Sequence, residues 1–407
     1  MFYCPPGYEV PVYEGRLYPS GHPDAPSSSV RPDRCFPSEG SARAAGATLV
    51  EPGAAAVASL SGTTILFGIG LSTDPFGMSR PHGAGLLSAE GTKLRSVELT
   101  VPRLAPDRWL PDGSVVVRRQ VARRNPVTGR RTLVPRLLRH EADANSFGPG
   151  RPVPLPSPIV DASWSPDGSR IAYEPVRWSA QGYGSSGRVL VIDASGSERT
   201  FVARGHLAGW TPDGRIVIWS DRAMRDLIAV DPASGRRTLL LAGGEAEQLA
   251  RVDGLGLGEP VFSRDGRFMA TRVYGWPAGS RITAGILIAT AGGRGVRLVT
   301  SRYLISMIAW SPAEDLLAYT TSGFPDPHEL FIVGPAEEPR RLYEGPAHFD
   351  WVTWSPDGRW VLIDDEALDR WLLFKPKGSG RSPLWLPRLG GAPMWCCPQG
   401  AFAEALE

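Results

Sequence analysis

The sequence predicts an all-β protein, a β-propeller of about seven four-stranded blades. A five-residue motif, Trp-x-Pro-Asp-Gly, recurs along the chain. Glycine and proline are abundant, with 47 and 39 copies among 407 residues, while apolar residues still make up 42%. Many short strands joined by tight turns explain this composition better than disorder does. The density of proline also disfavours long helices, because an interior proline removes a hydrogen bond and clashes with the preceding turn.

The motif occurs in four full copies and three weakened ones. The full copies are Trp109–Gly113, Trp164–Gly168, Trp210–Gly214 and Trp354–Gly358. The weakened copies are Phe262–Gly266, Trp310–Glu314 and the faint Ser59–Gly62. Their aligned last positions lie 44 to 55 residues apart, which is a propeller-blade spacing.

Each residue of the motif suits one turn between two strands. Proline presets the first corner, aspartate hydrogen-bonds nearby backbone, and glycine takes the positive φ that closes a hairpin. The tryptophan ends a strand and offers a large surface for packing between blades. Apolar runs such as Ile216–Trp219 follow the turn, and a second hairpin follows those, as in Val189–Asp193 with Phe201–Val202. Each repeat therefore supplies four strands, A to D, with the motif between A and B.

These repeats resemble the TolB-like (Trp-Ser-Pro-Asp-Gly repeat) β-propeller family, related in shape to the Trp-Asp (WD40-like) repeat proteins. The resemblance covers roughly residues 55–400 and implies a bacterial, periplasmic or secreted protein. We therefore expect an irregular N-terminal extension over 1–54, a propeller over 55–400 and a tail over 401–407. A six-bladed ring with a separate N-terminal cap stays open. The segment Met1–Pro6 has no basic or apolar signal-peptide region, so the compartment is unknown from the residues.

The two ends of the ring are expected to meet. Residues 392–400 look like an unfinished strand A and turn, whereas the first repeat has a degraded strand A. We expect the last strand to complete the first blade and close the ring. All four cysteines lie near the chain ends, at Cys4, Cys35, Cys396 and Cys397. A bridge from Cys4 or Cys35 to Cys396 or Cys397 is one hypothesis, and four free thiols are the other.

The binding site is expected on the face that carries the longer connections, 136–158, 174–188 and 272–285, because function gathers in long loops on rigid scaffolds. Aromatic and arginine side chains there suit an interface, and polar groups near the channel could bind a peptide or small ligand. The candidates are Trp178, Tyr183, Tyr274, Trp276, Arg177, Arg281, His206, His348, Asp161 and Asp350. The alternative is that the rings cover blade edges and the polar groups are solvated.

The residues favour binding over catalysis. No Gly-x-Ser-x-Gly elbow or phosphate-binding loop occurs. Asp364–Glu366 is read as a solvated turn, with calcium as the alternative and no other cofactor expected. The net charge of +2 gives no field that recruits nucleic acid. Residues 52–71 carry no charge, yet their small residues favour a buried part of the first blade over a membrane anchor.

We therefore expect a monomeric, non-enzymatic scaffold that binds a protein or peptide, without nucleic acid and without stable membrane insertion. Two alternatives remain: a hydrolase or lyase with a polar site at the central channel, and the sensor domain of an envelope regulatory system. Converging acid and base groups in one cavity would favour the enzyme.

Overall fold

The computed structural model describes residue 60 and, with short gaps, residues 63–396, as well as four short strands nearer the N-terminus. The gaps are 74–78, 91–92, 101–103, 111, 144–145, 156–157, 197–198, 222, 252–254, 276–282, 302, 323–327, 346–348, 366–369, 378–382 and 388–390.

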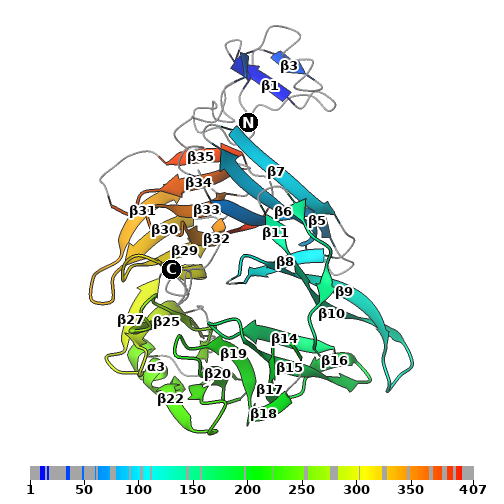
Figure 1. Cartoon of the computed structure of the whole chain (residues 1–407). Helices are drawn as coiled ribbons and strands as arrows, with labels where there is room; N and C mark the ends of the chain where they lie inside the picture. The colour runs from blue at the N-terminus through cyan, green and yellow to red at the C-terminus, as the bar shows by residue number, and fades with distance from the viewer. Residues whose placement is uncertain are drawn as a thin grey trace.

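Seven four-stranded antiparallel sheets follow one another around a central axis (Figure 1), so the prediction of seven blades is confirmed. Blade 1 contains β36 (Gly391–Trp395), β5 (Thr64–Thr73), β6 (Ser79–Glu90) and β7 (Lys93–Thr100). Blade 2 contains β8 (Leu104–Trp109), β9 (Val115–Arg124), β10 (Arg131–His140) and β13 (Arg151–Pro152). Blade 3 contains β14 (Ile159–Trp164), β15 (Arg170–Ser179), β17 (Arg188–Asp193) and β18 (Arg199–Arg204).

The remaining blades follow the same order from strand A to strand D. Blade 4 contains β19 (His206–Trp210), β20 (Ile216–Trp219), β21 (Leu227–Val230) and β22 (Arg237–Leu241). Blade 5 has a strand A in two pieces, β23 (Gly256–Leu257) and β24 (Val261–Phe262), then β25 (Phe268–Gly275), β26 (Thr283–Thr290) and β27 (Arg297–Ser301). Blade 6 contains β28 (Leu304–Trp310), β29 (Leu317–Ser322), β30 (His328–Val333) and β31 (Arg340–Gly345). Blade 7 contains β32 (Phe349–Trp354), β33 (Val361–Asp365), β34 (Arg370–Phe374) and β35 (Leu384–Pro387).

Few elements lie outside the blades. The short helix α3 (Gly243–Ala250) connects blades 4 and 5, and β11 (Ala142–Asp143) pairs with β12 (Ser146–Phe147). The predicted irregular extension contains β1 (Val10–Tyr13), β2 (Arg16–Leu17), β3 (Arg34–Phe36) and β4 (Thr48–Leu49). These four form one small sheet, which lies beyond the ring in Figure 1. No helix in the described parts of the chain is both long and apolar enough to cross a membrane.

The recurring motif forms the A–B turn, as predicted. In blade 3 the Ser165 hydroxyl donates to Asp167 at 2.5 Å and accepts from the Arg170 amide at 2.9 Å, while Gly168 has a φ of +65°. Burial alone would raise the pKa of Asp167, but hydrogen bonds from Ser165 and Ser169 outweigh it and lower that pKa. The same serine or threonine to aspartate bond recurs in blades 4, 5 and 7, so the motif folds largely through its own side chains.

The motif tryptophans also tie neighbouring blades together. The Trp210 indole donates to the carbonyl of Ser163 at 2.9 Å, and Trp354 donates to Ala309 at 2.9 Å. In both cases the acceptor lies one residue before the equivalent tryptophan of the preceding blade. Apolar side chains fill the space between blades in a series of buried clusters around the ring. The predicted role of the tryptophans in packing between blades is therefore confirmed.

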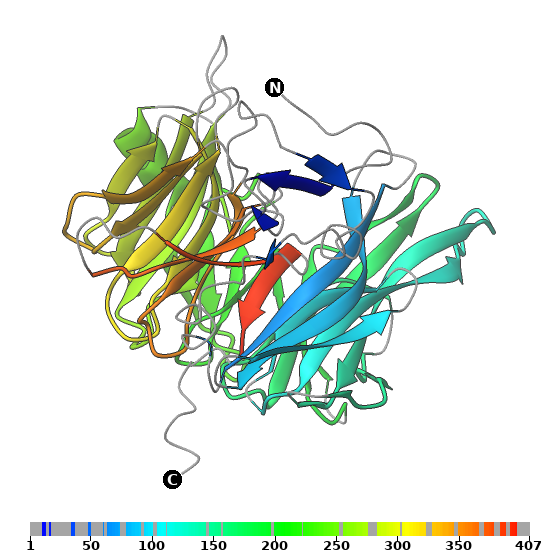
Figure 2. The ribbon, with the colours of Figure 1, turned by 90° about the horizontal axis from the view of Figure 1, so that it is seen from above.

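The ring closes through the C-terminal strand, also as predicted. Strand β36 pairs with β5, with Trp395 opposite Ile65, and Figure 2 shows the red β36 beside the blue strands of blade 1. The Trp395 indole reaches the Thr63 hydroxyl at 3.1 Å, and the Cys396 amide donates to the carbonyl of Thr64 at 2.6 Å. The A–B turn of blade 1 is therefore built from residues of both chain ends. Cys396 is disulfide-bonded, and its pairing with Cys4 or Cys35 stays a prediction.

The predicted long connections are largely strands. Residues 136–140 end strand β10, and 174–179 end β15, which folds back as β16 (Gly182–Ser185). The hairpins β9–β10 and β15–β16 therefore extend beyond the four-stranded part of blades 2 and 3. The loop prediction was wrong there because arginine, glycine and proline interrupt the apolar pattern while the backbone ladder continues.

Candidate functional site

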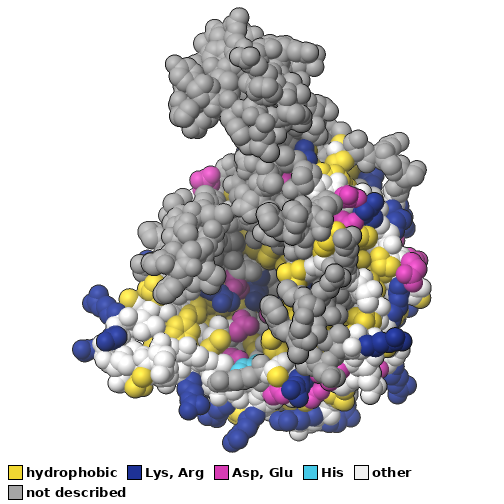
Figure 3. Space-filling model, turned by 180° about the vertical axis from the view of Figure 1, so that it is seen from behind, with side chains coloured by type: hydrophobic (Ala, Val, Ile, Leu, Met, Phe, Trp, Pro, Cys, Tyr) yellow, Lys and Arg dark blue, Asp and Glu magenta, His cyan; other side chains and the backbone are white. Residues whose placement is uncertain are grey.

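Strand A is the inner strand of each blade, and Figure 1 shows β8, β14, β19 and β32 nearest the axis of the ring, where the central channel is predicted. From behind, Figure 3 shows a hollow in which acidic, basic and histidine side chains gather. Asp161 and Glu259 take equivalent places in blades 3 and 5, three residues before the aromatic residue that ends each strand A. Asp161 lies on β14, one of these inner strands.

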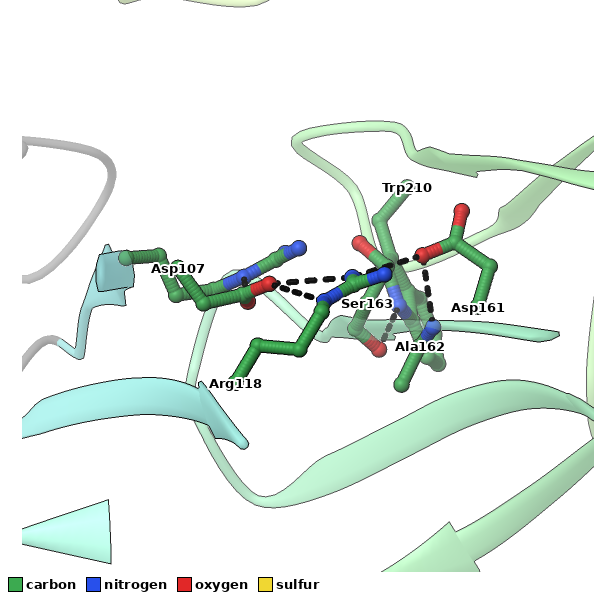
Figure 4. A network of polar contacts seen from close by, with 7 residues as sticks. Asp107, Arg118, Asp161, Ala162, Ser163 and Trp210 are labelled. Carbon is green, nitrogen blue, oxygen red and sulfur yellow. Dashed lines mark hydrogen bonds and ion pairs between the residues drawn. The ribbon is translucent and has the colours of Figure 1, made fainter. Parts of the chain in front are cut away.

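Asp107 is the centre of an ion-pair network between blades 2 and 3 (Figure 4). One of its oxygens lies 2.8 Å from Arg108 Nε, and the other lies 3.0 Å from an Arg118 terminal nitrogen. The same Arg118 nitrogen lies 3.6 Å from an Asp161 oxygen. Burial alone would raise the pKa of Asp107, but the charges of Arg108 and Arg118 outweigh it and hold that pKa low. The network keeps opposite charges fixed at the channel wall.

Glu259 has the opposite electrostatic environment. Burial raises its pKa, the negative charge of Asp161 raises it further, and Arg108, Arg272 and Arg118 oppose the shift only in part. A carboxyl group that protonates easily beside a second carboxylate is a feature of acid–base sites and of buried polar networks. The charges that act on Glu259 therefore come from blades 2, 3 and 5.

His206 belongs to a second polar cluster, with Glu174 and Ser185. Ser185 Oγ lies 2.9 Å from His206 Nδ1, and Glu174 Oε1 lies 3.2 Å from the same nitrogen. A Ser-His-acid triad needs the serine on one ring nitrogen and the acid on the other. Burial raises the pKa of Glu174, while His206 opposes that rise. The arrangement fixes the hairpin of blade 3 to blade 4 and does not form a triad.

The predicted aromatic patch is divided between two blades. Trp178 and Tyr183 form an edge-to-face pair on the β15–β16 hairpin, with ring centres 6.0 Å apart, and Arg177 is exposed beside them. Tyr274 lies in blade 5 under Arg272, whose guanidinium is 5.4 Å from the ring centre. Tyr274 therefore lies in blade 5, on a different blade from the hairpin that carries Trp178 and Tyr183.

Several predicted residues remain untested. Trp276, Arg281 and His348 lie outside the described residues, and Asp350 belongs to strand β32.

The predicted solvated turn at Asp364–Glu366 needs correction. Asp364 and Asp365 are both buried in β33, and the Asp365 carboxylate meets Arg370 Nε at 3.0 Å. A cation already neutralises Asp365, so Asp365 is not a solvated turn residue. Within the ranges that the structure describes, no group of three or more His, Cys, Asp or Glu side chains could hold a metal ion.

A cavity of about 640 Å³ lies between the hairpins of blades 2 and 3. Trp178 forms one wall, and β9, β10, residues 152–155 and residues 158–159 form the others. Asn125, at the β9–β10 turn, donates to the carbonyls of Ser179 at 2.8 Å and Gly182 at 3.3 Å. The tips of the two hairpins are thereby joined above the cavity. Sequence reasoning missed this groove, because only the fold brings Asn125 to a carbonyl 54 residues away.

Comparison with known proteins supports the fold only. No family model matches the chain, and no curated protein matches it. Among solved structures, a putative 6-phosphogluconolactonase from Bacteroides uniformis is 14% identical, with a TM-score of 0.50, over 82% of this chain and 99% of that one. The periplasmic gluconolactonase of Pseudomonas aeruginosa is 17% identical, with a TM-score of 0.45, over 82% and 98%. TolB from Acinetobacter baumannii is 17% identical, with a TM-score of 0.42, over 80% and 67%.

Proposed function

We propose that the protein is a non-enzymatic binding scaffold, and that the groove between the hairpins of blades 2 and 3 holds a protein or peptide segment. The observation that carries this proposal is the cavity of about 640 Å³ beside Trp178. Cavities of a few hundred to 1,000 Å³ lined by apolar groups are the usual size of ligand sites.

The groove is pre-formed, which favours binding. Asn125 is 1% exposed, and its side-chain amide joins the two hairpins while its oxygen accepts from the amides of Val127 and Thr128. A site that is already ordered loses less conformational entropy when a partner binds. Trp178 is half-buried and is held by Tyr183. Rigid tryptophan side chains of this kind are common hot spots of interfaces.

A random peptide library displayed on phage tests the proposal. The library is selected on the immobilised full chain, and the selected peptides are then measured on Trp178→Ala. We expect an affinity loss of about tenfold or more, the usual effect of removing a hot-spot aromatic. Phe201→Ala is the matched control, because Phe201 is an exposed ring of blade 3 outside the groove. Failure to select any peptide, or equal affinity for wild type and Trp178→Ala, would count against the groove.

A hydrolase or lyase at the channel is the second candidate, and one observation favours it. Glu259 has a raised pKa beside Asp161 and near three arginines, as a general acid would. Against an enzyme, the carboxylates of Asp107 and Asp161 already form ion pairs with Arg118. Turnover of a lactone or glycoside substrate that is abolished by Glu259→Gln, with binding to the groove unchanged, would favour the enzyme.

A further inference from the structure

One hairpin carries a large share of the positive charge of the molecule. We call residues 113–140, which comprise β9, β10 and the turn between them, the arginine hairpin. It contains no Asp, Glu or Lys, whereas the whole chain has a net charge of only +2. Its eight arginines are Arg118, Arg119, Arg123, Arg124, Arg130, Arg131, Arg136 and Arg139.

Most of this charge is not neutralised within the molecule. Arg118 pairs with Asp107, and Arg139 pairs with Asp112. The other six arginines are exposed, and within the described ranges none has a carboxylate as an ion-pair partner. Like charges held this close repel one another and oppose folding. An anionic partner would relieve that repulsion, so the charge distribution points to one.

The outer edge of β10 is open next to these charges. Strand β13 pairs only with Leu138 and Arg139, and the Val153 amide donates to the carbonyl of Leu137. No described strand pairs with the outer edge of residues 131–136. Since backbone groups alternate along a strand, the amide and carbonyl of Leu133 point to this edge, as does the carbonyl of Pro135. Proline is tolerated there because that position needs no ladder donor.

The groove beside this edge combines apolar walls with cations. Its apolar walls include Val121, Val134, Leu137, Leu155, Ile159 and Trp178. Its cations are Arg123, Arg124 and Arg136. An extended polypeptide points alternate side chains to opposite sides. Alternating apolar and acidic residues would therefore fill the groove and meet the arginines at the same time. Single-stranded nucleic acid binds by stacking bases on several aromatic rings, and Trp178 is the single aromatic ring among the described residues that line the groove.

We propose that the arginine hairpin binds an extended acidic segment of a partner protein, which adds as a strand to the open edge of β10. Main-chain hydrogen bonds would come from the edge, the apolar residues of the segment would enter the groove, and its carboxylates would meet Arg123, Arg124 and Arg136. This is strand addition with selection by charge. It rests on the proposed function, because it identifies the segment that the groove holds.

Fluorescence anisotropy with defined probes tests the charge and the strand addition separately. The full chain is titrated into a labelled decapeptide of alternating Glu and Val, and into its Gln–Val counterpart. We expect the Glu–Val peptide to bind more tightly, by about tenfold, with an affinity that falls as salt screens the charges. The double variant Arg123→Glu/Arg136→Glu should bind the Glu–Val peptide about tenfold more weakly than the wild type does. Arg236→Glu/Arg237→Glu is the matched control, because these exposed arginines lie on blade 4.

A second variant keeps the charge and blocks the edge. Leu133→Pro removes the one backbone amide between Arg131 and Pro135 that points to the open edge. This variant should therefore also bind the Glu–Val peptide more weakly. Circular dichroism and the urea midpoint test whether it folds. The proposal is overturned if the Glu–Val peptide does not bind, if it binds the charge-reversed variant equally, if Leu133→Pro has wild-type affinity, or if a thymidine homopolymer binds more tightly. Library peptides that depend on Trp178 but not on the arginines would leave the groove function standing and remove this inference alone.

Discussion

Trp109 Nε1 donates a hydrogen bond of 3.0 Å to the carbonyl oxygen of Met394, 285 residues further along the chain. Met394 lies one residue before Trp395 in β36, so this bond repeats the link that joins the other blades. Here, however, the acceptor belongs to the strand that closes the ring. The junction between blades 1 and 2 therefore depends on a strand that the chain adds last.

Trp109→Phe should loosen this closure. It keeps most of the apolar ring and removes the donor, which should cost about 1 kcal/mol. Trp310→Phe is the matched control, since it loses the equivalent bond to the carbonyl of Val261 within the ring. We expect similar urea midpoints for the two variants. Only Trp109→Phe should speed hydrogen exchange in Gly391–Trp395, and unchanged exchange there would contradict this view of the closure.

Asp107→Asn should weaken the channel network in a pH-dependent way. The pKa of Asp107 is lowered in the folded state by Arg108 and Arg118. Its contribution to stability is therefore present above the unfolded pKa of about 3.9 and is lost as the pH falls through the lower, folded value. We expect the variant to lose about 2 kcal/mol at pH 7 and progressively less below pH 4.

Urea titrations at pH 7, 5 and 3.5 measure this difference. Glu338→Gln is the control, because Glu338 is 94% exposed in its pair with Arg297 and surface pairs contribute little. A gap between wild type and Asp107→Asn that stays constant with pH would show that the arginines do not lower the pKa of Asp107.

Glu259→Gln should change the stability of the fold in the opposite direction to Asp107→Asn. Burial and Asp161 raise the pKa of Glu259, so its stabilising contribution is full below the unfolded pKa and is lost as the pH rises through the folded value. Glutamine avoids the ionised form, and the variant should be more stable than wild type at pH 7 but not at pH 4. Adding Asp161→Asn should reduce this gain. If Glu259→Gln is instead less stable at pH 7, the arginines dominate the environment of Glu259.

The sequence predicts the scaffold far better than the site. The motif carries its own turn, as the bonds of Ser165 to Asp167 and Arg170 show, so the A–B corners and the closing strand could be predicted locally. The site depends on side chains from separate blades. Arg118 reaches Asp161 from another blade, next to a bulge between Pro106 and Arg108. The spacing of residues in the sequence does not predict that Arg118 and Asp161 come into contact. The open edge of β10 is likewise not predictable, because it depends on where the pairing between β13 and β10 ends.

The buried Asp365–Arg370 pair should be a strong stabilising contact of blade 7. Asp365 is 0% exposed and the Arg370 side chain 8%, and the two residues are cross-strand partners. Removing one charge leaves the other buried, which typically costs about 3–5 kcal/mol. We expect such losses for Asp365→Asn and Arg370→Met in urea unfolding, and a smaller loss for Asp365→Leu/Arg370→Met. Purely additive losses would show that the two charges are not coupled.

Asn125→Ala should open the groove without touching its walls. The variant loses the donors to Ser179 and Gly182 and the acceptor for Val127, so both hairpin tips should exchange amide hydrogens faster. Because Trp178 and the arginines remain, any loss of peptide affinity would come from ordering the hairpins on binding, and we expect about a three- to tenfold loss. Asn125→Asp is the companion variant, since it keeps the acceptor and removes only the donors. If peptide affinity is unchanged while exchange at residues 178–182 rises, the groove does not need to be pre-formed, and the open edge of β10 alone would have to explain binding.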